Sequence, residues 1–297
     1  MQRSEIIGGS DIAAIVGVSR YKTPLQLWAE KKGILKRETT EAMELGTELE
    51  GFVAKKFEKV TGLVVRRDRK EFKHKEYPYL VGHIDRRIVG QNELLECKTT
   101  SAWKAKEWVD DEIPEEYILQ VNWYLGLTGM EKGYIACLIG GQKFIWKVIH
   151  FDQELYEACV KSAVDFYENY LTKDNPPVAV ADDNPILAEI YKDSGMAMAV
   201  YEGDAPEINK MLDERELLSL HIRNLEKQKG DIEAKIKQFL GENNAGETDK
   251  YRFYWKETRK KVIDYNRLKE DKIFEDYAKE IIYRNFRIYK KKGENNG

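Results

Sequence analysis

Cysteine and histidine are scarce in this chain of 297 residues. The three cysteines and four histidines are widely scattered, which excludes a disulfide framework and a four-cysteine metal site. No two histidines have the HxxxH spacing of a metal site. With so few cysteines, we expect a reduced protein of the cytoplasm.

Long hydrophobic runs are also missing. The longest stretch without a charged residue is 117–130, well short of the ~20 residues that a membrane-spanning helix needs. Near the start of the chain, Glu5 and Asp11 interrupt the apolar stretch, which argues against a signal peptide. We therefore predict a soluble, cytoplasmic protein that does not associate with membranes.

Net charge is small as well. The 49 basic and 52 acidic side chains leave a formal charge of −3, which excludes a uniformly basic nucleic-acid coat but not a local patch. Residues 250–297 carry 15 Lys and Arg against 8 Asp and Glu, or +7, which leaves −10 for the rest. Aromatic and basic side chains alternate in that segment. The pattern suits contact with DNA, and equally a small strand pair with one buried face.

A hydrophobic fraction of 42% is sufficient for a folded core. Apolar periodicity, capping residues and turn residues predict the order of elements in the first 172 residues. Helices are expected at 10–15, 23–33, 41–60, 114–127 and 152–171, and strands at 63–65, 71–73, 79–89, 93–99, 134–139 and 144–150. This order predicts an α/β fold with a mixed central sheet flanked by helices, not a doubly wound parallel sheet.

Turn-rich segments divide the chain into parts. We assign residues 1–175 to one domain, 176–205 to a linker, 206–240 to a long helix and 247–297 to a small basic α+β module. The long helix has a heptad seam in which eight of ten positions are apolar: Ile208, Met211, Leu218, Ile222, Leu225, Ile232, Ile236 and Phe239. Such a seam predicts a partner, which is either the chain's own domain or another copy in a coiled coil.

Three acidic side chains occupy positions that a purely structural role does not explain. On a helical wheel of residues 41–60, Glu50 lies on or beside the apolar stripe. Asp85 and Glu96 flank a turn at 90–92, so cross-strand pairing can bring them close together. Two carboxylates at close range repel one another unless a cation or a proton relieves the repulsion.

These side chains favour a divalent metal ion. Mg²⁺ prefers one or two carboxylates, with water and substrate phosphate completing its octahedron. The predicted ligands are Asp85, Glu96, the backbone carbonyl of Cys97 and, approaching from its helix, Glu50. Lys98 shares a strand face with Glu96, so it could orient or help to deprotonate a metal-bound water. Such a set fits metal-assisted phosphodiester hydrolysis.

Four sequence blocks follow one another in a characteristic order. They are Glu50, Ile84-Asp85, Glu96-Cys97-Lys98 and Gln120-Val-Asn-Trp-Tyr124. The order resembles the PD-(D/E)XK nuclease superfamily, with Ile84 in place of its proline, and the last block resembles the QxxxY motif of the RecB-like branch. The opening segments 7–15 and 21–28, together with Leu45-Gly46, are similar to the lambda-type phage exonucleases and YqaJ-like viral recombinases. The resemblance covers roughly residues 5–172.

The resemblance implies roles for the matching residues. It implies metal binding by Asp85, Glu96 and the Cys97 carbonyl with support from Glu50, and catalytic roles for Lys98 and Gln120. Gln120 and Tyr124, with Tyr117 one turn earlier, could hold substrate or orient the site, or form an interior hydrogen-bonded pair. Ser10 and Arg20 resemble the region that holds the 5′ phosphate of a DNA end. Their alternatives are a helix N-cap for Ser10 and a surface charge for Arg20.

The resemblance also implies an activity. We expect a phage or prophage exonuclease in the bacterial cytoplasm that digests double-stranded DNA ends with Mg²⁺ or Mn²⁺ and leaves a single-stranded tail. A 5′-to-3′ direction, a ring-like homo-oligomer (possibly a trimer) and a single-strand annealing protein as partner are further implications. The alternatives are a Cas4-like or RecB-like enzyme acting on single strands without an iron–sulfur cluster, and a non-catalytic DNA-binding module that retains the fold.

Overall fold

The computed structural model describes residues 5–36, 39–192, 199, 201 and 203–257. The chain divides into two compact units, Met1–Asp193 and Ser194–Gly297. Within the described ranges, no helix is both long enough and apolar enough to cross a membrane.

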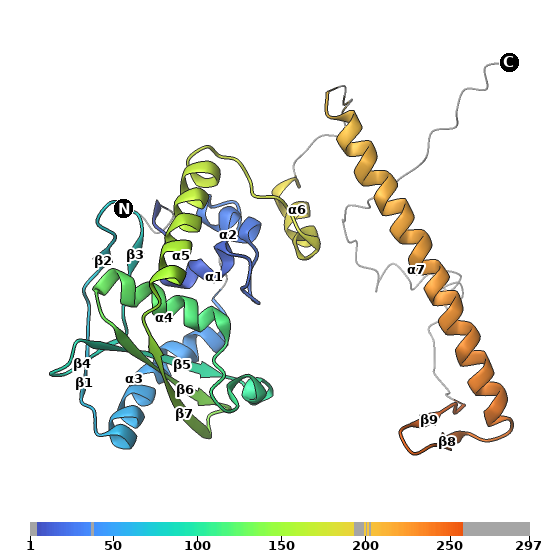
Figure 1. The fold of residues 1–297 in the computed structure, drawn as a ribbon, viewed down its shortest axis with the longest axis horizontal. Helices are drawn as coiled ribbons and strands as arrows, with labels where there is room; N and C mark the ends of the chain where they lie inside the picture. The colour runs from blue at the N-terminus through green and yellow to red at the C-terminus, as the bar shows by residue number, and fades with distance from the viewer. Residues whose placement is uncertain (1–4, 37–38, 193–198, 200, 202, 258–297) are drawn as a thin grey trace, which may run out of the picture. The chain divides into compact units, whose positions relative to one another are not determined.

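A five-stranded mixed sheet forms the centre of the first unit (Figure 1). Its strands are β1 (Val65–Arg67), β4 (Arg86–Ile88), β5 (Glu93–Thr100), β6 (Lys132–Ile139) and β7 (Lys143–His150), in that spatial order. The β5–β6 pair is parallel, and the other three pairs are antiparallel. A separate antiparallel pair joins β2 (Phe72–Lys73) to β3 (Val81–Gly82). The mixed central sheet predicted from the sequence is confirmed.

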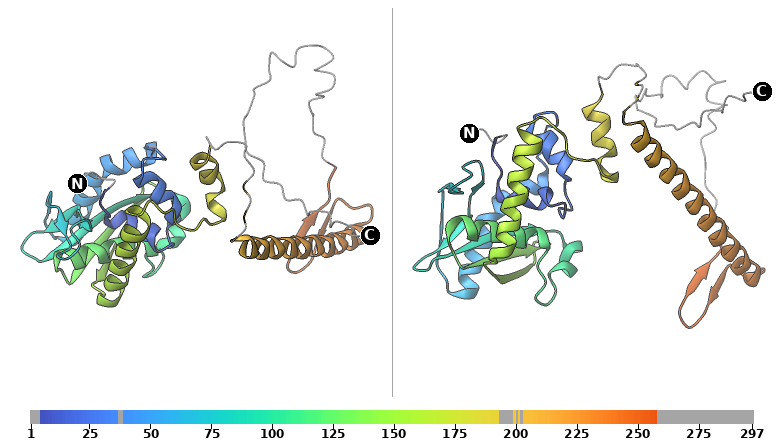
Figure 2. Two further views of the ribbon diagram at one scale, coloured as in Figure 1. Left: turned by 90° about the horizontal axis from the view of Figure 1, so that it is seen from above. Right: turned by 45° about the horizontal axis from the view of Figure 1, so that its top comes forward.

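Helices cover both faces of this sheet, as the views of Figures 1 and 2 show. On one face lies α3 (Glu41–Thr61), whose Phe57 packs with Leu95 of β5. On the other face lie α1 (Gly9–Ile15), α2 (Pro24–Lys31), α4 (Glu115–Thr128) and α5 (Gln153–Asp165). Leu94 and Leu95 are both fully buried, each in a different apolar cluster, because neighbouring side chains of a strand point to opposite faces. Burial of each such leucine contributes about 2 kcal/mol.

Capping residues set the helix bounds close to the predicted ones. The Thr23 side chain accepts a hydrogen bond from the backbone N–H of Gln26 at 3.0 Å and so caps α2. Thr40 caps α3 in the same way. At its other end α3 stops at Gly62, whose φ of +73° would strain a residue that carries a Cβ atom.

The strand predicted at 79–89 is wrong, because the structure breaks it in two. β3 ends at Gly82, an irregular stretch covers 83–85, and β4 begins at Arg86. The chain changes partners at this break, since β3 pairs with β2 whereas β4 pairs with β1 and β5. At the break a side chain takes over part of the hydrogen bonding: the Asp85 carboxylate accepts the backbone N–H of Cys97 at 2.8 Å.

The chain beyond α5 continues to pack on the first unit. Asp183 is fully buried, and its carboxylate accepts hydrogen bonds from the Thr23 hydroxyl and from the backbone N–H of Val180. α6 (Asn184–Ile190) follows, and its Leu187 and Ile190 pack against the main apolar cluster. Part of the segment assigned to a linker is therefore attached to the first unit.

The second unit consists, where described, of one long helix and a hairpin. The helix is α7 (Ala205–Leu240), and the hairpin joins β8 (Ala245–Glu247) to β9 (Arg252–Tyr254). Relative to the described residues, seven apolar side chains of the heptad seam are exposed: Met211, Leu218, Ile222, Leu225, Ile232, Ile236 and Phe239. Most of the basic module predicted at 247–297 lies outside the described residues.

Candidate active site

The register of the β4–β5 hairpin brings Asp85 and Glu96 together. Arg86 pairs with Leu95 in this antiparallel hairpin. Asp85, one residue before Arg86, therefore comes opposite Glu96, one residue after Leu95. The hydrogen bond from the Cys97 N–H to Asp85 Oδ2 holds the two segments at this point. The two acids therefore lie at the end of the short hairpin pairing, near the centre of the sheet.

Glu96 is the most deeply buried acid of the group, with 3% of its surface exposed. Its Oε1 atom accepts hydrogen bonds from Lys98 Nζ at 2.8 Å and from Gln120 Nε2 at 2.9 Å. Its Oε2 atom is buried and has no hydrogen-bond partner among the described residues. A buried acceptor without a partner costs about 1–3 kcal/mol, which a bound cation would offset. Oε2 of Glu93 and of Glu107 is unpartnered in the same way, and Glu96 differs from these two acids in having the Asp85 carboxylate as a neighbour.

Gln120 connects the strand to helix α4. Its Oε1 atom accepts a hydrogen bond from Lys98 Nζ at 2.9 Å, and its Nε2 atom donates to Glu96 and to the Tyr124 hydroxyl, both at 2.9 Å. One amide thus orients an acid and an amine simultaneously. Gln120 and Tyr124 form a buried pair, which is the interior arrangement considered above, but the pair is also bonded directly to the acidic cluster.

Tyr124 is held from two sides by glycines. A Cβ atom on Gly9 of α1 would lie 2.5 Å from the Tyr124 ring, and one on Gly82 of β3 would lie 3.1 Å from it. Contacts this close leave no room for a side chain at the first position, so the backbone of α1 approaches the ring directly. The tyrosine hydroxyl that positions Gln120 is consequently fixed by the fold.

Without a cation, burial and mutual repulsion disfavour the charged forms of the carboxylates in this cluster. Burial raises the pKa of Asp85 to about 8, and the neighbouring Glu96 carboxylate adds to the effect. Burial alone would lower the pKa of Lys98, but the Glu96 and Asp85 carboxylates outweigh it and raise that pKa instead. Lys98 therefore carries an ammonium group, and its single positive charge is shared between two acids.

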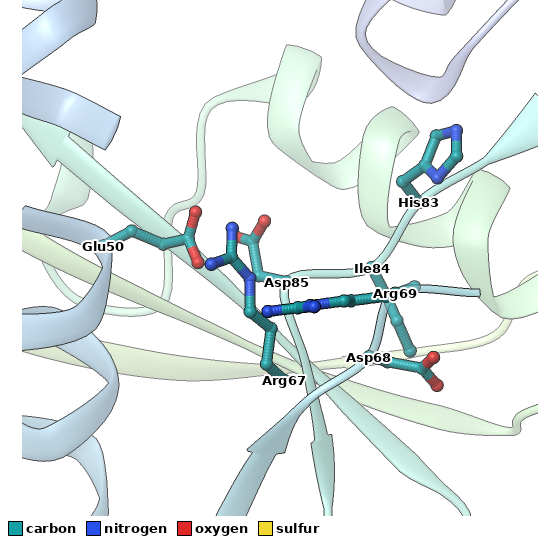
Figure 3. Close-up of a pocket in the computed structure, with 7 residues that line it drawn as sticks. All are labelled: Glu50, Arg67, Asp68, Arg69, His83, Ile84 and Asp85. Carbon is teal, nitrogen blue, oxygen red and sulfur yellow. The ribbon is translucent and has the colours of Figure 1, made fainter. Parts of the chain in front are cut away.

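Glu50 reaches the same place from α3. Its carboxylate forms an ion pair with Arg86, whose guanidinium also donates to the Asp85 backbone carbonyl at 2.7 Å. Glu50 and Asp85 line a cavity of about 400 Å³, and Figure 3 shows the Glu50 carboxylate directed toward Asp85. α3 can approach this closely because it presents Gly46 to Thr99 of β5, where a Cβ atom would lie only 3.3 Å from the threonine hydroxyl.

The same cavity contains cations that the sequence reasoning missed. Arg67 and Arg69 line it beside the acids, and Arg86 forms an ion pair with Glu50, one of the acids that line it. The available signal was the segment 66–70, in which four of five residues are basic, and it becomes meaningful only once the strand register places 66–67 opposite 86–87.

The donor set fits a hard divalent cation in part. In the portion of the chain that the structure describes, no three His, Cys, Asp or Glu side chains are gathered closely enough to hold a metal ion. Asp85 and Glu96 nevertheless provide two carboxylates, one with an unpartnered oxygen, and Mg²⁺ commonly uses one or two carboxylates with water. Glu50 is bonded to Arg86 instead, and ligation by the Cys97 carbonyl stays a prediction.

Ser10 lines a different cavity from Glu50 and Asp85. It is exposed in the first turn of α1, but Gly8 precedes the helix and the Asp11 carboxylate accepts the Gly8 N–H at 3.1 Å, so Ser10 is not the N-cap. Ser10 and Tyr124 line a second cavity of about 540 Å³. His83 lines both this cavity and the one beside Asp85, which makes the two neighbours.

Arg20 and Tyr117 have different surroundings. The Arg20 guanidinium forms salt bridges with Glu107 at 2.7 Å and Glu116 at 3.2 Å, so it is neither a free surface charge nor an empty anion site. Tyr117 is closer to the cluster, because Lys98 Nζ lies 5.2 Å from the centre of its ring. α1 separates Arg20, beyond its C-terminal end, from Ser10 in its first turn.

A family model and a relative in sequence agree on what this chain is similar to. The model of the YqaJ-like viral recombinase domain matches residues 1–131. The uncharacterized protein YqaJ of Bacillus subtilis is 36% identical over 301 residues, which covers 97% of this chain and 92% of the relative.

Solved structures show the same fold. An alkaline exonuclease from Laribacter hongkongensis, LHK-Exo, superposes with a TM-score of 0.50 at 18% identity, over 58% of this chain and 91% of that one. A phage-related exonuclease from Haemophilus somnus gives a TM-score of 0.42 at 14% identity, over 57% of this chain and 96% of that one. The predicted α/β fold class, a mixed central sheet flanked by helices, is confirmed, and LHK-Exo shares this fold.

Proposed function

The chain belongs to the YqaJ-like viral recombinase family, and from this premise we propose that it is a metal-dependent deoxyribonuclease that degrades linear duplex DNA from its ends in phage recombination. The observation that carries the proposal is the buried, unpartnered Oε2 atom of Glu96 beside Asp85. Lys98 and Gln120 are bonded to the other oxygen of the same carboxylate, which supports an intact hydrolytic site.

Each residue of the cluster has a distinct task in this proposal. Mg²⁺ or Mn²⁺, when bound, would supply charge neutralisation at the phosphate and an activated water. Asp85 and Glu96 would hold the cation, and the Cys97 carbonyl would add a third oxygen. Lys98 has three N–H donors, of which two are used by Glu96 and Gln120, so the third can donate to a phosphate oxygen and stabilise its charge.

The finer features of the activity rest on the resemblance. We infer 5′-to-3′ digestion of double-stranded DNA ends that leaves a single-stranded tail, a single-strand annealing protein as partner, and action in the cytoplasm of the bacterial host. The alkaline exonuclease LHK-Exo has the same fold, which supports the exonuclease assignment by analogy. Ser10 and Arg20 remain proposed contacts to a 5′ phosphate, although Arg20 would have to exchange Glu107 or Glu116 for it.

A comparison of DNA substrates tests the proposal. The full chain, supplied with Mg²⁺ or Mn²⁺, is expected to degrade linear duplex DNA carrying 5′ phosphates, and to leave nicked circles and single strands largely intact. EDTA should abolish the reaction. Preferential degradation of single strands would favour the Cas4-like or RecB-like alternative, and binding of DNA without degradation would favour the non-catalytic module.

A homo-oligomer is the remaining part of the proposal, and the seam of α7 is the surface to test. Substituting Leu218→Lys and Leu225→Lys charges the seam, so it is expected to lower the molar mass measured by light scattering if the seam joins copies. Leu217→Lys with Leu220→Lys is the matched control, because these leucines are also exposed on α7 but lie off the seam. An unchanged mass in the seam variant would show that α7 does not assemble the oligomer.

A further inference from the structure

Strands β1 and β4 bring four arginines into direct opposition. Arg66 is paired with Arg87, and Arg67 with Arg86. Like charges directly opposite each other on antiparallel strands are destabilising. The arrangement therefore requires anions nearby, and these four arginines do not share them evenly.

Carboxylates neutralise only one arginine of each pair. Arg86 is paired with Glu50, and Arg87 with Asp68 at 3.2 Å. Arg66 and Arg67, together with the following Arg69, are exposed and form no salt bridge within the described residues. The strand therefore retains positive charge that the protein itself does not balance.

Arg67 and Arg69 differ from Arg66 in where they lie. Both line the cavity of about 400 Å³ that also contains Glu50 and Asp85, whereas Arg66 does not. Figure 3 shows the Arg67 side chain rising from β1 toward Asp85 and Glu50, with the Arg69 side chain extending alongside. Two unbalanced guanidinium groups thus face the side of the acidic cluster that is open to solvent.

We propose that Arg67 and Arg69 form an anion subsite that binds a backbone phosphate of the nucleic-acid strand entering the cavity beside Asp85. The inference rests on the proposed function and adds to it the residues that hold the strand next to the hydrolytic cluster. A guanidinium group matches the oxygens of a phosphodiester with two parallel N–H donors, and remains charged at any physiological pH.

The subsite offsets the repulsion between the acidic cluster and a negatively charged strand. Asp85, Glu96 and Glu50 repel an approaching polyanion, and Arg86 is already engaged by Glu50. Two guanidinium groups at the rim of the cavity offset this repulsion and orient the strand before it reaches Lys98. Arg67 and Arg69 are accordingly residues that bind and position substrate, separate from the groups at the reacting phosphate.

Salt-dependent DNA binding tests the subsite. All variants are made in a Glu96→Gln background, so that binding is measured without hydrolysis, and fluorescence anisotropy follows a short labelled duplex with 5′ phosphates at several salt concentrations in Mg²⁺. Arg67→Gln with Arg69→Gln is expected to weaken binding about tenfold or more. It should also reduce the slope of log affinity against log salt by about 0.9, since the subsite binds one phosphate and each neutralised phosphate contributes about 0.9 on duplex DNA.

The control removes equal charge from the same segment outside the cavity. Arg66→Gln with Lys70→Gln affects two exposed side chains that do not line it, and is expected to change the affinity and the slope much less. Equal losses in both double variants would indicate general attraction and overturn the subsite. An unchanged slope in the Arg67 and Arg69 variant would also overturn the subsite. This holds even if inorganic phosphate no longer competes with DNA for binding to that variant.

The outcome is separable from that of the proposed function. If the wild-type chain degrades linear DNA but the Arg67 and Arg69 variant binds like the control, the subsite fails and the nuclease stands. If the wild-type chain degrades no DNA while the selective loss of slope is observed, the nuclease proposal fails and a DNA-binding subsite stands.

Discussion

Replacing Glu96 by Gln is expected to lower the rate of metal-dependent DNA hydrolysis on the order of 10³-fold. The substitution preserves the size of the side chain and leaves one carbonyl oxygen to accept the hydrogen bond from Lys98. It removes the negative charge and replaces the unpartnered oxygen by an uncharged NH₂ group. Saturating single-turnover rates on a linear 5′-phosphorylated duplex measure the effect, and thermal unfolding monitors the fold.

Glu93→Gln is the matched control for this prediction. Glu93 lies on the same strand β5 but at an odd-numbered offset from Glu96, so its side chain points to the opposite face, where it pairs with Lys132 at 2.8 Å. Its replacement is expected to change the rate less than about twofold, because Glu93 lies on the opposite face of β5 from the acidic cluster. A Glu96→Gln enzyme as fast as wild type would remove Glu96 from the catalytic cluster, whereas equal losses at both positions would point to damage of β5 itself.

The affinity for the divalent ion is expected to rise about 100-fold between pH 6 and pH 9. The pKa of Asp85 is raised to about 8, chiefly by burial and then by Glu96, so a proton occupies this carboxyl below that pH and must leave before a cation binds. Each pH unit below the pKa costs about tenfold in apparent affinity, and the dependence levels off above it. Isothermal titration calorimetry with Mn²⁺ at several pH values measures it.

The same group makes the metal-free protein sensitive to alkali. A carboxyl whose pKa is raised in the folded state favours folding while it is protonated, so its contribution is complete below about pH 4 and is lost as the pH rises through about 8. The melting temperature in EDTA should therefore fall between pH 6 and pH 9, and saturating Mn²⁺ should restore it. Asp85→Asn is the control: the fall attributed to this carboxyl should disappear, and metal binding should weaken. A metal-free melting temperature unaffected by both pH and Asp85→Asn would contradict the assignment.

Local sequence signals predicted most helices and strands and the order of the motif blocks along the chain. Thr23 and Gly62 mark a helix start and a helix end by their own side-chain and backbone preferences, and the structure has those ends there. The resemblance to the YqaJ-like family is confirmed by the family model and by the relative YqaJ. The sequence could predict it because the motif blocks combine acidic, basic and amide residues in a fixed order that chance seldom produces. The break at 83–85 escaped prediction, since alternation continues through it in the sequence while the chain changes sheets.

Contacts between distant residues were the least predictable part of the site. The Arg20 guanidinium looked available for a phosphate, yet its hydrogen-bond partner Glu116 lies 96 positions away and meets it only when α4 packs beside α1. Ser10 looked like an N-cap, but Asp11 supplies the capping carboxylate instead. Helix packing decides the first case, whereas the second is a local choice between two neighbouring side chains at the start of α1.

The sequence by itself predicted the family through the order of its motif blocks and the mixed α/β architecture through apolar periodicity and turn residues, and both are confirmed. That its acidic residues hold a cation stays a prediction. Only the tertiary structure decided which charges are balanced. Glu50 neutralises Arg86, whereas Arg67, directly opposite Arg86 on β1, has no salt bridge among the described residues and lines the cavity that Glu50 also lines. One carboxylate oxygen of Glu96 accepts hydrogen bonds from Lys98 and Gln120, and the other has no described partner. The physical reason is that strand register and helix packing set distances of a few ångströms between residues far apart in the chain, and ionic interactions and hydrogen bonds form or fail over such distances.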